Sequence, residues 1–345
     1  MDPTGLVVRF PTNRPLTEQE RAHQLHQKRR LNVKPRYQLS VIRMNLTYLE
    51  SVDKWFGWKG TISVCATALC LVFTLTFGHT ALLFLLEAAS ILPSTEDRGV
   101  LLANGLGMAS IIGLIVWFCI WLLRKECFAY THYPIRFDGG IAWYMSGART
   151  VPCCRCHGMT FFFSLFRLSG EWEVRGHVLA ADRDTVVESF ALSHHDVMQH
   201  QDLDPAATQY SDQDFVRSHW EFIRRYMEEG PNTVIDPVQF CIPVDGRRES
   251  AIFGMHRVFA NFSGHSWVMI AMVAPICLTI ALFRIFAMRT SKIPRWPQEV
   301  EAACVIDEGD PYAIVGDAEG NRLFVYPEAA PAAVGTVSGT PGPSA

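Results

Sequence analysis

Two apolar runs near the N-terminus decide the architecture of this chain. Residues 61–78 read TISVCATALCLVFTLTFG and residues 99–123 read GVLLANGLGMASIIGLIVWFCIWLL. A helix that crosses the hydrocarbon layer of a bilayer needs about 20 apolar residues. The first run continues as the largely apolar residues 79–92, and a short polar stretch, PSTEDR at 93–98, then precedes the second run. We therefore predict a transmembrane α-helical hairpin over residues 60–124, whose first helix ends near His79 or near Glu87.

Side chains typical of the membrane interface flank this hairpin. Trp55, Trp58 and Lys59 precede the first run, and Arg124 and Lys125 end the second. Tryptophan concentrates at the level of the lipid headgroups, and Lys and Arg remain mainly on the cytoplasmic side. These membrane anchors predict that both ends of the hairpin lie in the cytoplasm and that its tip lies outside.

Residues 1–59 form a basic region ahead of the hairpin, with 11 Lys or Arg against 5 Asp or Glu. No secretory signal is visible in them, so we predict a cytoplasmic N-terminus. A capping box of Thr17 and Glu20 predicts an amphipathic helix over 17–32. Its basic end, residues 28–30, suits a solvated surface or lipid headgroups, and no nucleic-acid-binding signature accompanies it.

The composition indicates a membrane protein with a soluble part. Of the 345 residues, 49% are hydrophobic, which is high for a soluble domain and low for a chain that lies wholly in the membrane. Four of the ten cysteines lie inside apolar runs, where a thiol behaves as a small apolar group. We therefore expect free thiols and no disulfide framework.

Residues 125–233 consist of short alternating runs separated by turn signals, which predicts a cytoplasmic β-rich domain built as an antiparallel β-meander. Asp138 and Gly139 are typical of a two-residue hairpin turn, because both positions of a type I′ turn need positive φ. Over residues 171–179, Trp172 and the valines alternate with charged residues and a histidine. This alternation predicts a strand with one buried face and one face in water.

The clearest helix of this domain is predicted at 212–229. Trp220, Ile223 and Met227 recur at helical spacing and form an apolar stripe. A helix of this kind after a β-meander suits a lid across the open end of a sheet. The resulting α+β domain has the outline of a pleckstrin-homology-like (PH-like) sandwich, and a generic α+β domain fits the same pattern.

A third hydrophobic segment, residues 251–288, predicts a further helix near the C-terminus. A single crossing would place Arg289, Lys292 and Arg295 outside, against the positive-inside rule. Either the rule fails here, or the segment is a re-entrant or paired element that returns to the cytoplasm. Arg284 favours an interfacial position for the end of this segment.

The remaining residues are assigned to two regions. We favour a cytoplasmic location for the C-terminal region, residues 289–326. Residues 327–345 consist mostly of Ala, Pro, Gly, Ser and Thr, with almost no charge. That composition predicts a disordered tail.

One cluster of metal-ligand residue types occurs in the chain. The candidate ligands are Cys153, Cys156, His157, His195 and His200. Zinc sites usually pair two knuckles of the C-x2-C type, and neighbouring residues of a strand point to opposite faces, so we expect no metal. No P-loop, dinucleotide fingerprint, nucleophile elbow or zincin helix is visible. We therefore predict a protein that is not an enzyme and holds no cofactor.

Three stretches carry a resemblance to a known family: PIRFD at 134–138, WEFIRRYMEEGP at 220–231 and RTSKIPRWP at 289–297. The chain resembles uncharacterised proteobacterial multi-pass membrane proteins, which are defined by a domain of unknown function and often encoded near type VI secretion effectors. The resemblance covers most of the chain from the hairpin to about residue 312. It brings no catalytic residues to carry over.

The resemblance implies an immunity or accessory protein of a toxin delivered between bacteria. We therefore expect a non-enzymatic protein of the bacterial inner membrane, whose partners are the lipid bilayer and a secreted toxin or secretion-system component. The alternative is a membrane channel or transport component assembled as a homo-oligomer. Neither expectation involves nucleic acid.

Overall fold

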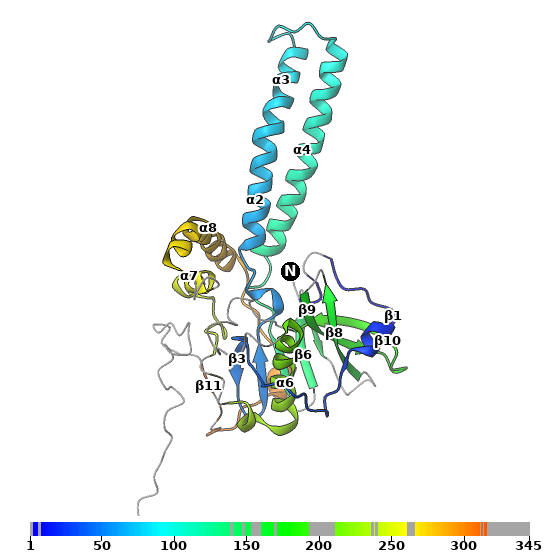
Figure 1. Cartoon of the computed structure of the whole chain (residues 1–345), viewed down its shortest axis with the longest axis vertical. Helices are drawn as coiled ribbons and strands as arrows, with labels where there is room; N and C mark the ends of the chain where they lie inside the picture. Colours follow the sequence, from blue (N-terminus) through cyan, green and yellow to red (C-terminus); the bar gives the residue numbers. More distant parts are fainter. Residues whose placement is uncertain are drawn as a thin grey trace, which may run out of the picture. The chain divides into compact units, whose positions relative to one another are not determined.

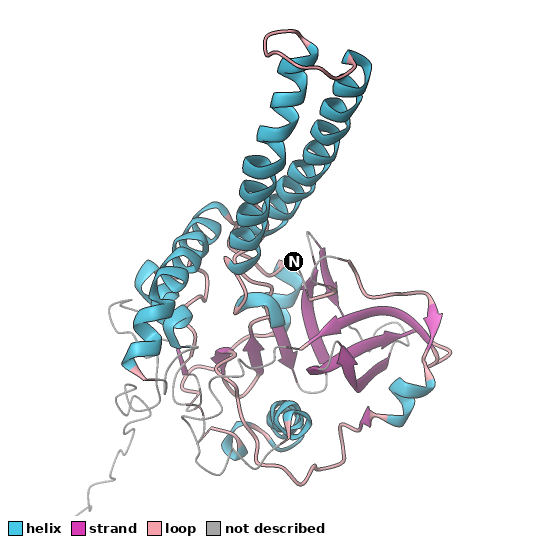
Figure 2. Ribbon diagram, turned by 45° about the horizontal axis from the view of Figure 1, so that its top comes forward, coloured by secondary structure: helices cyan, strands magenta, loops and turns pink. Residues whose placement is uncertain are grey.

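The computed structural model divides the chain into two compact units. The sheet unit comprises Met1–Gly57, Tyr130–Cys277 and Lys292–Ala345, and the helical unit comprises Trp58–Ala129 and Leu278–Ser291. Figure 1 labels many of their elements, and Figure 2 distinguishes the helices from the strands. The structure describes residues 3–5, 8–138, 141–146, 149–152, 160–168, 171–192, 211–235, 238, 241–260, 266–310, 312 and 314–315.

A six-stranded antiparallel sheet unites distant parts of the sequence. Its order is β11-β3-β4-β5-β6-β7. The strands are β3 (Val41–Met44), β4 (Tyr48–Ser51), β5 (Ile135–Asp138), β6 (Ile141–Ser146), β7 (Arg149–Pro152) and β11 (Ile314–Val315). Strands β4 and β5 are neighbours, with Ser51 opposite Ile135. The whole helical hairpin is therefore inserted between two paired strands.

The second sheet has five strands in the order β1-β10-β9-β8-β2, all antiparallel. Its strands are β1 (Arg14–Pro15), β2 (Gln24–Leu25), β8 (Thr160–Leu168), β9 (Glu171–Leu179) and β10 (Thr185–Ala191). Gly176 in β9 leaves room for the Phe190 ring, since a Cβ at this glycine would lie 2.4 Å from it. The sheet is built from the central part of the chain and edged by the N-terminal segment.

Residues 1–59 differ from the separate basic region expected from the sequence. The capping box of Thr17 and Glu20 is present, but the helix that it opens, α1, covers only Glu18–Ala22. The chain then enters β2, which pairs with β8. The prediction of a helix over 17–32 was wrong, because pairing with a distant strand overrides the local helical pattern.

Helix α6 (Asp212–Glu229) begins and ends where the sequence predicted, with Ser211 as N-cap and Gly230 at its end. Its indole Trp220 packs on the Phe163 ring of β8 at a centroid distance of 4.4 Å. The hydroxyl of Tyr226 donates to the carbonyl of Asn45, between β3 and β4. Helix α6 therefore contacts both sheets.

The polar side of α6 is buried as well, which the lid interpretation did not anticipate. The backbone amide of Leu31 donates to the Glu221 carboxylate at 3.1 Å. The amide of Arg36 donates to the carbonyl of Ser218 at 3.1 Å. Residues 31–38 therefore cover the side of the helix that faces away from its apolar stripe, and α6 is an internal helix of the sheet unit.

The helical unit contains a long antiparallel pair. Its first arm runs through α2 (Thr61–Phe73), a π-helical turn η2 (Thr74–Gly78) and α3 (His79–Ala88), and its second arm is α4 (Arg98–Cys127). The arms lie side by side (Figure 1). Gly105 permits the close approach of α4 to α3, because a Cβ at this position would lie 2.8 Å from the Leu85 side chain. The first arm continues well past His79, as the longer of the two predicted alternatives required.

Among the described residues, three helices are long and apolar enough to cross a membrane: Thr61–Ala88, Arg98–Cys127 and Trp267–Thr290. The last of these is α8, which contains Pro275 and follows α7 (Ala251–Ala260). Helix α9 (Gln298–Ala303) then packs on β4 through Val300, which clusters with Tyr48. Short 3-10 turns occur at η1 (Lys54–Phe56) and η6 (Pro231–Thr233).

Candidate functional site

The helical hairpin is closed at one end by a single buried carboxylate. Glu126, in the last turn of α4, accepts hydrogen bonds from the backbone amides of Gly60 and Ser63, each at 2.7 Å. It also accepts from the Ser63 hydroxyl. These amides begin α2 and have no partner within that helix, and a negative charge near a helix N-terminus is stabilising. The carboxylate therefore joins the end of one arm to the start of the other.

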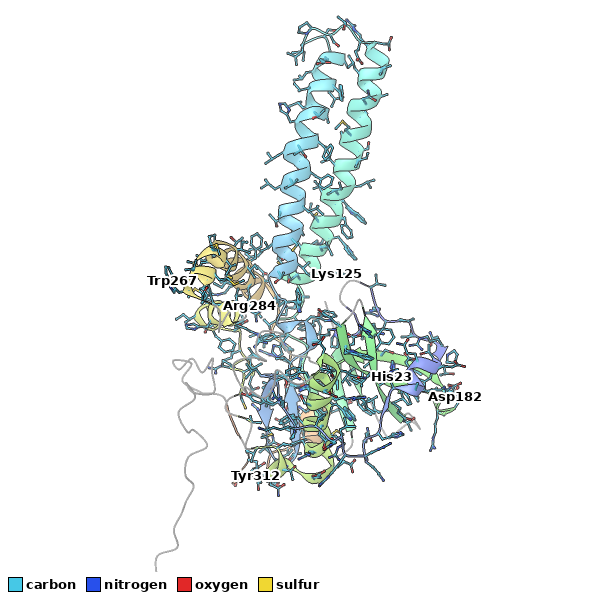
Figure 3. All side chains as sticks on the ribbon, viewed as in Figure 1. His23, Lys125, Asp182, Trp267, Arg284 and Tyr312 are labelled. Atoms are coloured by element: carbon cyan, nitrogen blue, oxygen red, sulfur yellow. The ribbon has the colours of Figure 1, made fainter. Side chains whose placement is uncertain are left out.

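The end of α8 is fixed at the same place. The guanidinium of Arg284 donates to the Lys59 carbonyl at 3.2 Å. The Ser291 hydroxyl donates to the Cys127 carbonyl at 3.3 Å, and that of Thr290 donates to the same carbonyl. The start of α2, the end of α4 and the end of α8 thus meet in one cluster (Figure 3). We call it the helix base: Lys59, Gly60, Ser63, Glu126, Cys127, Arg284, Thr290 and Ser291.

Gly60 permits the close approach of α8 to this cluster. Its φ of +95° lies in a region that residues with a Cβ rarely adopt. A Cβ there would also lie 2.6 Å from the Arg284 backbone nitrogen. Both the backbone conformation and the space therefore require glycine.

Three of the predicted membrane anchors, Trp58, Arg124 and Lys125, belong to the helical unit, and their side chains are exposed or half-buried. Trp58 is 50% exposed and Arg124 is exposed. The Lys125 ammonium lies 4.1 Å from the centre of the Trp121 ring. An amphipathic aromatic ring beside a cation is typical of the headgroup level.

The other two predicted anchors are placed differently. Lys59 is buried, at 6% exposure, and its backbone carbonyl accepts a hydrogen bond from Arg284 in the helix base. Trp55 is half-buried in the sheet unit, where the Lys54 ammonium lies 4.7 Å from its ring. The spacing in the sequence does not show that Lys59 is buried and Trp55 half-buried within the protein.

The predicted wet face of β9 is in fact buried. Glu173 is 1% exposed, Arg175 5% and His177 0%. The N-terminal segment covers this face, since Arg175 lies over the Phe10 ring at 4.2 Å and His177 lies 3.6 Å from the Glu20 carboxylate. The alternation along the strand was read correctly as two faces, but it cannot show that another segment covers the polar one.

His177 lies at the centre of this covered face. Its Nε2 is 3.1 Å from the Ser164 hydroxyl, and its Nδ1 is 2.8 Å from that of Ser189. Burial lowers the pKa of His177 to about 4, against the opposing effect of Glu20. Burial alone would raise the pKa of Glu20, but hydrogen bonds from Arg14 and Thr17 bring it to about 2. Near neutral pH the imidazole is neutral and hydrogen-bonded on both sides.

Glu173 on the same face forms an ion cluster with two cations. It pairs with Lys54 and with Arg175, whose Nε lies 2.5 Å from its Oε1. Burial would raise the pKa of Glu173, but the two cations hold it below its ordinary value. The Arg175 guanidinium also stacks on the Phe166 ring at 3.6 Å. Each buried charge therefore has a partner of opposite sign.

A second ion cluster lies on the six-stranded sheet and unites two of the three stretches that carry the family resemblance. Arg136 donates to the Glu50 carboxylate at 2.7 Å. Its guanidinium lies 4.1 Å from the Tyr48 ring and 4.8 Å from the Trp296 ring. The Trp296 indole donates to the other Glu50 oxygen at 3.1 Å. The stretches 134–138 and 289–297 thus meet at one buried guanidinium, that of Arg136.

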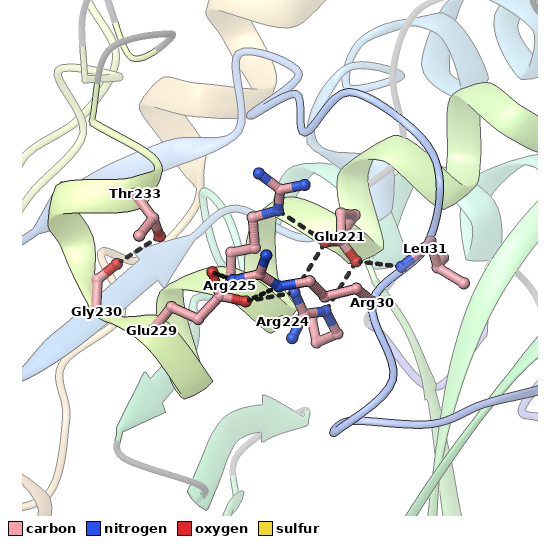
Figure 4. Close-up of polar contacts among 8 residues, drawn as sticks. All are labelled: Arg30, Leu31, Glu221, Arg224, Arg225, Glu229, Gly230 and Thr233. Atoms are coloured by element: carbon pink, nitrogen blue, oxygen red, sulfur yellow. Dashed lines mark hydrogen bonds and ion pairs between the residues drawn. The ribbon is translucent and has the colours of Figure 1, made fainter.

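The third stretch forms an ion network along α6 (Figure 4). The Glu221 carboxylate accepts from Arg224 at 2.8 Å and from Arg225 at 2.7 Å. Glu229 accepts from Arg224 at 2.7 Å and from Arg30 at 2.7 Å. This network includes Glu221, Arg224, Arg225 and Glu229, four of the five charged residues of the stretch, and it holds residues 30–31 against the helix.

The predicted structural residues are placed as follows. Trp220 and Ile223 are fully buried, while Met227 is half-buried. Trp172 is half-buried, with its ring 5.7 Å from that of His23. Asp138 ends β5 and is half-buried. Its predicted turn partner, Gly139, lies outside the described residues.

The candidate metal ligands cannot be placed. Cys153, Cys156, His157, His195 and His200 all lie outside the described residues. Within the part of the chain that the structure describes, no group of three His, Cys, Asp or Glu residues is arranged to hold a metal ion.

Sequence reasoning missed the residues that build the helix base and the cluster around the buried Arg136. Glu126 carried one usable signal: it is an acid in the last turn of a helix, where the helix dipole disfavours negative charge. A partner elsewhere was therefore to be expected. Arg136 and Trp296 carried none, because they are far apart in the chain and their contact depends on the pairing of the sheet.

The comparisons with known proteins name a family over part of the chain. Residues 158–308 match the model of a family of unknown function, DUF6708. This range includes β8 to β10, α6, α7 and α8. No curated protein and no solved structure matches the chain.

Proposed function

We propose that this protein is a non-enzymatic binding protein anchored in a bacterial inner membrane. The hairpin crosses the bilayer twice, and the sheet unit binds a protein partner in the cytoplasm. One observation carries the proposal: the hairpin is inserted between Ser51 and Ile135, which are paired in neighbouring strands. Both ends of the insertion therefore start from the same folded body, as a membrane anchor that crosses twice requires.

Within the sheet unit, Asp53 bridges the two segments of chain that flank the insertion. One oxygen of the buried Asp53 carboxylate accepts from the Trp55 amide at 3.0 Å, and the other accepts from the Tyr133 amide at 2.8 Å. The side chain thus ties the chain that leaves the sheet to the chain that returns.

The order of elements in the sheet unit supports a PH-like sandwich. Strands β3 to β7 form one antiparallel meander, strands β8 to β10 form another, and α6 follows them. Many domains with two meanders and a following helix act as binding modules, which is an argument from fold alone. A partner strand could add to the edge strand β7 through main-chain hydrogen bonds.

The identity of the partner rests on the resemblance of the three motif stretches. It implies a toxin delivered by a type VI secretion system, or a component of that system. The cationic residues near both ends of the hairpin, such as Lys59 and Arg124, support a cytoplasmic sheet unit. In this role the protein protects its own cell, or assists delivery, by binding.

The proposal is tested by the survival of cells that express a toxin candidate encoded near this protein. We expect the full chain to restore growth at an equal toxin level. The matched control replaces residues 61–127 by a short flexible linker, which keeps the paired strands and removes the anchor. It should fail to protect against a toxin that acts at the membrane. Absence of rescue by the full chain, with the protein inserted and folded, would contradict the immunity role.

A homo-oligomeric channel or transport component is a second candidate, favoured by one observation. A Cβ at Gly107 or Gly113 of α4 would meet nothing within 4 Å, so these small residues leave room for another helix. Conductance across a planar bilayer by the purified chain would support this function, and its loss in Gly113→Leu would place the contact on this face. A sealed bilayer would exclude it.

A further inference from the structure

We infer that α7 and α8 form a re-entrant element that enters and leaves one leaflet of the membrane, on the side of the sheet unit. The partner of its exposed face is the phospholipid of that leaflet. The inference rests on the proposed membrane anchor and adds a second, independent membrane contact to it.

The chain on both sides of this element belongs to the sheet unit. Before α7, the amide of Ile242 donates to the carbonyl of Val41 in β3 at 2.7 Å. After α8, the amide of Thr131 donates to the carbonyl of Lys292 at 2.8 Å. A folded body of this kind lies on one side of a bilayer. The segment between these contacts therefore crosses the membrane an even number of times, or not at all.

Over the described residues, the lengths of the two helices do not fit a pair of full crossings. Helix α8 has 24 residues, which at about 1.5 Å per residue is enough for the hydrocarbon layer of about 30 Å. Helix α7 has 10 residues and reaches only about half of that thickness. With one long helix and one short helix, the element can return to its own side only if α8 does not complete a crossing.

The surface of α8 fits a lipid environment on one side. Met272, Ile276 and Leu282 are 70%, 62% and 67% exposed. Cys277 and Ala281, which lie between them in the sequence, are buried. A helix with one apolar exposed side and one covered side suits a position in the outer part of a leaflet, where acyl chains contact the exposed side.

The charges at the end of α8 fix the side of the membrane. Arg289, Lys292 and Arg295 are exposed and follow the last apolar turn. The helix base holds Thr290 beside Cys127, at the end of α4 where Arg124 and Lys125 also lie. Arg289 then lies at the same headgroup layer as Arg124 and Lys125, in agreement with the positive-inside rule for the end of α8.

Cysteine labelling of the full chain with a membrane-impermeant maleimide tests this topology. Three single variants are compared with the unsubstituted chain: Ser94→Cys at the hairpin tip, Ser266→Cys before α8, and Lys292→Cys after it. All three positions are exposed. Each is labelled in intact cells with a permeabilised outer envelope, and in inverted vesicles.

We expect Ser94→Cys to be labelled only from the outside and Lys292→Cys only in inverted vesicles. For Ser266→Cys we expect no labelling from the outside above that of the unsubstituted chain. Outside labelling of Ser266→Cys at the level of Ser94→Cys would show a complete crossing and overturn the re-entrant element while the anchor stands. Absence of outside labelling at Ser94→Cys would overturn the proposed membrane anchor, and the re-entrant element with it.

Discussion

The guanidinium of Arg136 is held 2.7 Å from the carboxylate of Glu50, and both side chains are buried. The same guanidinium lies near the rings of Tyr48 and Trp296. Burial raises the cost of an unpaired charge far above its cost in water. Because Trp296 contacts both members, the pair links the stretch 289–297 to the six-stranded sheet. The stability of each part therefore depends on the other.

Removal of one member of this pair should destabilise the sheet unit. We expect Glu50→Gln to lower the free energy of unfolding by about 3–5 kcal/mol, because it leaves the buried Arg136 with only the exposed Glu301, 3.7 Å away, as a counter-charge. The measurement is denaturant unfolding of the purified chain in detergent. Arg217→Ala is the matched control, since its pair with Asp214 is about one-third exposed and surface pairs contribute about 0–1 kcal/mol. Equal effects of the two variants would contradict the assigned role of Glu50.

A second prediction concerns the contribution of the Trp220 indole to stability. It is fully buried against Phe163, so Trp220→Ala should cost about 3–5 kcal/mol of stability. The half-buried Trp172 supplies the comparison, and Trp172→Ala should cost distinctly less. A decrease in the free energy of unfolding below about 1 kcal/mol for Trp220→Ala would contradict the internal packing of α6, because surface substitutions usually fall in that range.

Gly60 makes a prediction for the helix base. Gly60→Ala should destabilise the helical unit by about 1–3 kcal/mol or more, because φ is positive and the new Cβ would meet Arg284. Gly107→Ala is the control, since nothing lies within 4 Å of its Cβ position. Thermal unfolding in detergent compares the two. A Gly60→Ala chain as stable as Gly107→Ala would argue against the packing of α8 at this point.

The covered face of β9 makes the stability depend on pH. The pKa of His177 falls from 6.5 to about 4 on folding, so between these values the unfolded chain binds the extra proton. Stability therefore rises with pH across this window and is lost as pH falls from about 6.5 towards 4. One proton corresponds to a slope of about 1.4 kcal/mol per pH unit.

His177→Gln removes this proton and should flatten the slope between pH 4 and 6.5 in unfolding measurements. His219 contributes to the same window, because burial also lowers its pKa to about 4, and its proton remains in the variant. Glu20 acts below it: its folded pKa of about 2 lies under the ordinary 4.5, so its contribution is lost as pH falls from 4.5 towards 2. An unchanged slope in His177→Gln would show that this imidazole is not buried in neutral form.

Local patterns in the sequence were sufficient for several elements. The spacing of apolar residues gave α6 its bounds, and Ser211 and Gly230 act as the predicted start and stop signals. The capping box of Thr17 and Glu20 is likewise present. These features depend on residues within one or two turns of each other, so periodicity and capping chemistry contain the information.

The sequence by itself determined where the long apolar helices lie and how α6 begins and ends, because length, hydropathy and caps act over short distances. Only the tertiary structure decided that Glu126 closes the hairpin and that Arg284 reaches Lys59. It also decided that the N-terminal segment covers the polar face that carries His177. A buried charge must find a partner, but which one it finds depends on strand pairing and helix packing between residues far apart in the chain.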